Sequence, residues 1–226
     1  MRYRLLALAL LGALALGACG GDDPARTIAQ GEALFTVSFD APGVWEEGAW
    51  PLDSDQPDST LTLADGRYRI THRAADSNSF TWGVGGEAAE NVIVEVEAEQ
   101  LSDEDDNLYG VLCRVQTGDA GQTRGYALLI SGDGHYGIAA LDRGALAFVL
   151  EWRQSDAIHQ GQAGNTIRAE CVGDYLALYA NGVFLGDVTD STISGPGQVG
   201  LIAGVKRESA VVVTFDNLIV YEGRQD

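Results

Sequence analysis

The chain has 226 residues, of which 33 are acidic and 14 are basic, giving a formal net charge of −19. A surface this acidic repels nucleic acid and anionic lipid headgroups. We therefore predict no nucleic-acid partner and no basic patch that would hold the protein on a membrane. The length is sufficient for one large domain with a hydrophobic core.

The N-terminal segment has the order of an export signal. Arg2 and Arg4 precede an apolar run from Leu5 to Leu16, which is too short for a transmembrane helix of about 20 residues. The next residues, Leu16-Gly17-Ala18-Cys19, resemble the lipobox of bacterial lipoproteins. That resemblance implies cleavage before Cys19 and a diacylglycerol thioether on its sulfur.

This resemblance divides the chain into three parts. Residues 1–18 are expected to be a lipoprotein signal peptide, 19–30 a lipidated tether and 31–226 a β-sandwich domain. The acyl anchor would place the protein on the extracytoplasmic face of a bacterial cell membrane, with the lipid bilayer as one partner. The alternatives are an ordinary signal peptide with a chance cysteine and a cytosolic apolar N-terminus.

Beyond the tether, nearly every segment alternates apolar and polar residues with the period of a β-strand. The predicted strands are Leu34–Phe39, Arg67–Arg73, Ser79–Val84, Val92–Glu99, Leu108–Gln116, Gly125–Ser131, His135–Leu141, Leu146–Trp152, Thr166–Val172, Tyr175–Ala180, Val183–Val188, Gln198–Ala203 and Val211–Tyr221. Asn181-Gly182 predicts a type I′ hairpin turn, because both central positions need a positive φ. We therefore predict an all-β, antiparallel two-sheet sandwich.

The alternation also predicts which side chains face the core. The inward sets are Tyr68, Ile70 and His72, then Phe80, Trp82 and Val84, then Val92, Val94, Val96 and Ala98. Cys113 and Cys171 also fall on inward positions of their strands. A disulfide between them would stabilise the fold by about 3–5 kcal/mol in the chain-entropy model. The alternative is two buried thiols on separate strands.

From Asn91 onward the order of motifs resembles the concanavalin A-like lectin/glucanase superfamily, and more narrowly its laminin-G-like and 3-keto-disaccharide hydrolase-like (DUF1080) domains. The segments that carry this resemblance are Val92–Glu99, Asn107–Arg114, Tyr126–Ser131, Tyr175–Gly182, Gly197–Leu201 and Phe215–Val220. It implies a jelly-roll sandwich, but not one activity, because the fold hosts lectins, hydrolases and adhesion modules.

Glu95, Glu97 and Glu99 form the one array with the appearance of a catalytic site. Alternate residues of a strand stand about 6.5–7 Å apart on one face, a spacing that suits the two carboxylates of a glycosidase. The array is superficially similar to the Glu-x-Asp-x-(x)-Glu strand of family-16-like glucanases, but the middle aspartate is missing. The alternative is a solvated polar face.

Two acidic clusters are candidates for a calcium ion, since hard oxygen ligands suit Ca²⁺. One is the loop with Asp103, Asp105, Asp106 and Asn107, and the other pairs Asp40 with Asp216. The alternative for each is a solvated acidic turn. No other cofactor is expected.

The predicted ligand face combines polar rows with aromatic platforms. Arg69, Arg73, Thr81, Glu95, Glu97 and Arg114 are out of phase with the apolar residues of their strands, so we expect them on one exposed sheet surface. Trp45, Trp50 and Trp152 are candidates for stacking against sugar rings. The alternatives are cross-strand ion pairs and tryptophans that pack in the core.

Together these features predict a membrane-anchored lipoprotein whose lectin-like sandwich binds a glycan or another neutral surface ligand. The alternatives are a glycoside hydrolase of the 3-keto-disaccharide type and a protein-binding adhesion or structural domain.

Overall fold

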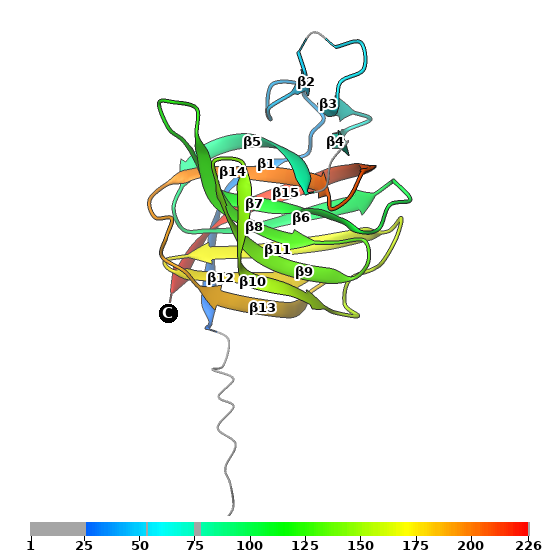
Figure 1. Cartoon of the computed structure of the whole chain (residues 1–226). Helices are drawn as coiled ribbons and strands as arrows, with labels where there is room; N and C mark the ends of the chain where they lie inside the picture. The colour runs from blue at the N-terminus through cyan, green and yellow to red at the C-terminus, as the bar shows by residue number, and fades with distance from the viewer. Residues whose placement is uncertain (1–25, 53, 75–77, 226) are drawn as a thin grey trace, which may run out of the picture.

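The computed structural model describes residues 26–52, 54–74 and 78–225, which form two antiparallel β-sheets stacked face to face (Figure 1). Nine strands form sheet A, in the order β13 (Val183–Thr189), β12 (Tyr175–Ala180), β11 (Gly164–Val172), β6 (Val92–Gln100), β15 (Ser209–Gln225), β4 (Arg67–Ala74), β3 (Ser59–Ala64) and β2 (Gly48–Trp50), with β1 (Ile28–Val37) paired to β15. Sheet B follows the order β10 (Ala145–Gln154), β9 (His135–Asp142), β8 (Thr123–Ile130), β7 (Asn107–Thr117), β14 (Gly197–Val205) and β5 (Ser79–Ala89). The predicted fold class is confirmed.

All thirteen predicted strands are present, with bounds that shift by a few residues. β2 and β3 were not predicted, because they lie in an acidic, proline-containing segment that we interpreted as a loop. β1 begins at Ile28, which pairs with Gln225, so residues 28–30 belong to the sandwich and not to a tether. Cys19 and the proposed signal peptide lie outside the described residues. No described segment forms a helix long and apolar enough to cross a membrane.

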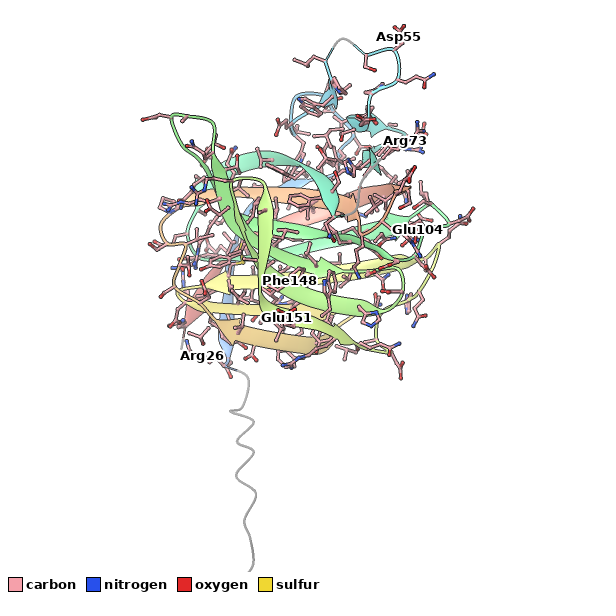
Figure 2. The ribbon with its side chains drawn as sticks, in the orientation of Figure 1. Arg26, Asp55, Arg73, Glu104, Phe148 and Glu151 are labelled. Atoms are coloured by element: carbon pink, nitrogen blue, oxygen red, sulfur yellow. A yellow bond between two sulfur atoms is a disulfide. The ribbon has the colours of Figure 1, made fainter. Side chains whose placement is uncertain are left out.

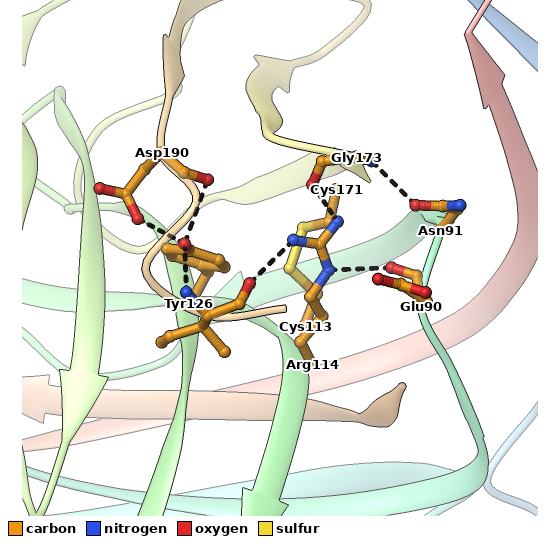
Figure 3. Close-up of a disulfide and its surroundings, with 9 residues drawn as sticks. Glu90, Asn91, Cys113, Arg114, Tyr126, Cys171, Gly173 and Asp190 are labelled. Carbon is orange, nitrogen blue, oxygen red and sulfur yellow. Dashed lines mark hydrogen bonds between the residues drawn. A yellow bond between two sulfur atoms is a disulfide. The ribbon is translucent and has the colours of Figure 1, made fainter. Parts of the chain in front are cut away.

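The main core lies between the sheets and contains the inward residues predicted for β4 and β6, such as Tyr68, Ile70 and Val94. Asn181 and Gly182 connect β12 to β13 with φ angles of 53° and 79°, which confirms the predicted turn. Cys113 of β7 and Cys171 of β11 form a disulfide across the core, with 6.6 Å between their Cα atoms (Figure 3). The predicted disulfide is therefore confirmed, and it joins the two sheets.

The orientation predicted for β5 is wrong. Phe80, Trp82 and Val84 point away from sheet A and pack on the other side of sheet B. Two of the inward positions of β5, Gly83 and Gly85, are glycines, because neighbouring rings fill the space there. A Cβ atom at Gly83 would lie 2.0 Å from the Tyr68 hydroxyl, and one at Gly85 would lie 2.2 Å from the ring of Trp45.

Candidate functional site

The outer face of sheet B, which points away from sheet A, is unusually apolar. A buried layer on this face is covered in part by aromatic and aliphatic side chains of β5 and β10. The buried layer is Leu108, Leu112, Val115, Ala127, Leu129, Leu141 and Ile202, and the covering side chains are Phe80, Trp82, Val84, Leu146, Phe148 and Trp152. An antiparallel sheet with one face in solvent normally carries polar side chains on that face. The apolar composition of this face therefore indicates a surface that contacts a ligand or a partner.

The same face is hollowed. β5 and β10 are the opposite edges of sheet B, yet Phe80 of β5 and Phe148 of β10 line one pocket. The edges therefore approach each other over the outer face. Figure 2 shows Phe148 on β10, where this strand passes in front of the sheet.

One pocket of about 390 Å³ lies beside β5, and we call it the Trp82 pocket. Its lining residues are Glu46, Trp50, Thr81, Trp82, Val84, Val115, Thr117 and Thr123. Two indole rings thus stand beside one carboxylate and several hydroxyl groups. Exposed indoles can stack on the apolar faces of sugar rings, and the polar groups can bind sugar hydroxyls.

The segment that carries Glu46 is fixed to β5 by backbone and side-chain hydrogen bonds. The Glu46 backbone N–H donates to the Val84 carbonyl at 3.0 Å, and the Val84 N–H donates to Glu46 Oε2 at 3.3 Å. The Tyr68 hydroxyl donates to the Glu46 carbonyl at 2.7 Å. These contacts position the wall of the Trp82 pocket before any ligand arrives.

A second pocket of about 420 Å³ lies toward β10, and we call it the Phe148 pocket. It is lined by Asn78, Phe80, Leu108, Gly144, Ala145, Leu146, Phe148, Trp152 and Lys206. The ring centroids of Phe148 and Trp152 are 5.2 Å apart, and the ring centroids of Phe80 and Trp82 are 5.8 Å apart. Since Phe80 and Trp82 touch, the two pockets are neighbours along β5.

The structure separates the residues predicted to share one ligand face. Arg69, Arg73 and Glu97 belong to β4 and β6 and lie on the outer face of sheet A. Thr81 belongs to sheet B and lines the Trp82 pocket, whereas Trp152 lies in the Phe148 pocket. The prediction of one continuous surface is therefore wrong, because β5 and β4 belong to different sheets.

Two predicted ligand residues are buried. Trp45 is 4% exposed, donates its indole N–H to the Gly83 carbonyl at 3.1 Å, and contacts the ring of Phe39 edge to face. It packs in the core and offers no surface for stacking. The prediction that Trp45 stacks against a sugar ring is therefore wrong. Trp50, from the same segment, does line the Trp82 pocket.

Arg114 is the other buried residue, at 1% exposure (Figure 3). Its guanidinium donates to the carbonyls of Glu90, Ile193 and Gly173 at 2.9, 3.1 and 2.6 Å. The φ of Arg114 is 52° and the β7–β8 register shifts after Cys113, so a β-bulge turns this side chain away from the predicted surface. Arg114 holds three loops together, and the expectation that it extends an open ligand face is wrong.

The glutamate row of β6 is largely occupied by ion pairs. Arg168 binds Glu95 at 2.6 Å and Glu170 at 2.9 Å, and burial raises the pKa of Glu170. Arg67 forms an ion pair with Glu99. Glu97 accepts a hydrogen bond from the Asn217 amide at 3.0 Å. This row lies on sheet A, away from the aromatic pockets, and its catalytic role stays a prediction.

The candidate calcium ligands do not converge. Asp103 accepts a hydrogen bond from the Gln162 amide at 2.7 Å, Asp106 lies 3.3 Å from Lys206 Nζ, and the Asn107 side chain is buried. Asp216 lies opposite Glu97 on sheet A, whereas Asp40 adjoins the β3–β4 turn at Gly66. Among the described residues, no three His, Cys, Asp or Glu side chains gather as a metal site. Calcium binding stays a prediction.

Sequence reasoning missed Phe80, Trp82 and Phe148 as surface residues. The alternation in β5 places Phe80 and Trp82 on one face, which we assign to the core, and we make no prediction for the orientation of Phe148. The available signal was the glycine at 83 and 85, since a strand with glycines in one phase and aromatics in the other carries its bulk on one face.

Comparison with known proteins shows the fold and no closer relationship. The sequence matches no protein-family model and no curated protein. The structure is similar to the carbohydrate-binding module CBM66 from Bacillus subtilis, with 13% identity and a TM-score of 0.60 over 79% of this chain and 96% of that chain.

Two further solved structures show the same likeness. A protein of unknown function with a galectin-like fold from Bacillus subtilis is 11% identical, with a TM-score of 0.63 over 88% of this chain and 100% of that chain. A β-glucanase from Bacillus licheniformis is 11% identical, with a TM-score of 0.59 over 84% of this chain and 98% of that chain. At these identities the likeness establishes the fold alone, and the fold is the concanavalin A-like β-sandwich.

Proposed function

We propose that this protein is a glycan-binding module and that its ligand lies on the outer face of sheet B. The observation that carries this proposal is the pair of adjoining, aromatic-lined pockets on a hollowed apolar face. Indole and phenyl rings supply stacking area, while Glu46, Thr117 and Asn78 supply hydrogen-bonding groups at the walls. The carbohydrate-binding module and the β-glucanase of the same fold support this choice.

The lining of the Trp82 pocket and the Phe148 pocket favours binding over hydrolysis on the outer face of sheet B. Most glycosidases place two carboxylates on either side of the bond that they cleave. The described residues that line the Trp82 pocket include one carboxylate, Glu46, and those that line the Phe148 pocket include none. A hydrolase of the 3-keto-disaccharide type, which the sequence resemblance implied, would need further acidic groups here.

We also propose that the module is exported and anchored by a lipid on Cys19. The Cys113–Cys171 disulfide supports an oxidising compartment, because such bonds persist outside the cytosol. In Figure 1, β2, which ends at Trp50, lies at the end of the sandwich opposite the start of β1 and the C-terminus. An anchor attached ahead of β1 would therefore leave the Trp82 pocket directed away from the membrane.

The binding proposal is tested with a glycan array probed by the purified full chain and two variants. Trp82→Ala removes one stacking ring and the contact that holds the ring of Phe80 in place. The affinity for any glycan that the parent chain binds on the array should therefore fall about tenfold. Phe184→Ala is the matched control, because Phe184 is an aromatic residue of 40% exposure on β13 of sheet A. The control should bind as the parent chain does.

Equal binding by the Trp82→Ala variant and the parent would refute the site. Retention of a protein ligand and of no glycan would favour the adhesion alternative. The anchor is tested separately by metabolic labelling with an alkyne fatty acid, which should mark the parent chain and not Cys19→Ser. Labelling that survives this substitution would exclude Cys19 as the lipid attachment site.

A further inference from the structure

The two pockets differ in charge, and this difference concerns the kind of sugar that each accepts. Lys206 is the only lysine in the chain, which carries 33 acidic residues. It is also the only ionisable side chain that lines the Phe148 pocket among the described residues. The Trp82 pocket instead contains a carboxylate, Glu46. One end of the face therefore carries a carboxylate and the other end an ammonium group.

The position of the Lys206 ammonium is well defined. Lys206 directly follows β14, whose last residue Val205 pairs with Asn107 at the start of β7. Its Nζ lies 4.1 Å from the centroid of the Trp152 ring and 3.3 Å from Asp106 Oδ1, and the side chain is 22% exposed. The aromatic face and the carboxylate hold the charge at the pocket wall.

This ammonium keeps hydrogen-bonding capacity for a ligand. An ammonium has three N–H donors. Asp106 is the one carboxylate that forms a salt bridge with it in the described part of the chain, while Asp133 lies near enough for the Lys206 charge to help lower its pKa. A half-buried charge is screened less by water than an exposed one, so its attraction for an anion is stronger. A pocket that bound only neutral hydroxyl groups would not require an ionised group in this position.

We propose that the Phe148 pocket binds an acidic sugar unit, with the ring against Phe80 and Phe148 and the carboxylate of a hexuronic acid on Lys206. The inference rests on the proposed glycan-binding function and specifies its ligand. The ligand class is an oligosaccharide that carries a uronate at the Lys206 end and neutral units at the Glu46 end.

The test uses paired oligosaccharides of identical linkage that differ only in a hydroxymethyl group or a carboxylate at C6. Titration calorimetry with the full chain should show tighter binding of the uronate member of the preferred pair. Lys206→Met keeps most of the aliphatic stem and removes the ammonium group that lies over the Trp152 ring. We expect it to lower the affinity for the uronate about tenfold and to change the affinity for the neutral partner less than twofold.

Arg207→Met is the matched control. Arg207 adjoins Lys206 and loses the same charge on substitution. It pairs mainly with Glu104 at 2.7 Å and more distantly with Asp106 at 4.0 Å, is 58% exposed and lines neither pocket. The Arg207→Met substitution should change the affinity for the uronate only slightly. Lys206→Arg should retain the preference, and the affinity for the uronate should fall as sodium chloride rises from about 50 to 500 mM.

Three outcomes would overturn the inference. Equal losses in Lys206→Met and Arg207→Met would show a general charge effect, and equal losses for neutral and acidic partners would show that Lys206 binds hydroxyl groups. Preference for the neutral partner, with binding still lost in Trp82→Ala, would refute the acidic ligand while leaving the proposed function intact. Failure of both members of every pair to bind would refute the proposed function itself.

Discussion

Removal of the Cys113–Cys171 disulfide should destabilise the sandwich strongly. The two cysteines are 58 residues apart and join β7 of sheet B to β11 of sheet A. In the chain-entropy model, closing a loop of this length removes about 14 cal/mol/K from the unfolded chain, or about 4 kcal/mol at 25 °C. We therefore expect the double variant Cys113→Ala, Cys171→Ala to lose at least about 4 kcal/mol of unfolding free energy, since both sulfurs also pack in the core.

The measurement is urea unfolding followed by tryptophan fluorescence. With a slope of about 2 kcal/mol per molar urea, the midpoint should fall by about 2 M in the double variant. The urea midpoint of the parent chain should fall by a similar amount when the chain is treated with a reductant before unfolding. Thiol titration of the unfolded, unreduced parent should find at most one thiol, that of Cys19.

Two results would refute this reasoning. A midpoint shift below about 0.5 M would show that the unfolded chain is already restricted or that the bond is strained in solution. Two further thiols in the unfolded, unreduced parent would show that the disulfide does not form.

Two other predictions concern buried polar side chains. Arg114→Met leaves the carbonyls of Glu90, Ile193 and Gly173 without their hydrogen-bond donor. It should lower the free energy of unfolding, measured by urea titration, by about 3–5 kcal/mol. A loss under about 1 kcal/mol would contradict the structural role of Arg114. His72 lies between two serine hydroxyls, and burial lowers its pKa below 6.5 although Asp58 acts in the opposite direction. The unfolded chain then binds the proton more readily, so stability should be full above about pH 6.5 and decline as the pH falls below it. His72→Gln should flatten this part of the pH profile, and an unchanged profile would exclude His72 as its source.

The local sequence was sufficient for several features of this fold. Asn181-Gly182 predicted a type I′ turn, because few other residue pairs adopt two positive φ angles at low cost. The alternation in β4 and β6 predicted their inward residues, since side chains of a strand point to opposite faces with a period of two. The inward phase of Cys113 and Cys171 likewise made a disulfide possible. These features depend only on neighbours along the chain.

The candidate site depended mainly on contacts between distant segments, although Gly83 and Gly85 indicated locally that β5 carries its bulk on one face. Alternation separates two faces of a strand but does not say which one meets the other sheet, and for β5 the rings of Tyr68 and Trp45 occupy the core side. Their positions follow from contacts between distant segments, so Phe80 and Trp82 are left on the outer face. The grouping of strands into sheets is equally non-local, and it separated Thr81 from the arginines of β4. Only the tertiary structure could decide that the largest apolar side chains of this strand form a surface and not the core.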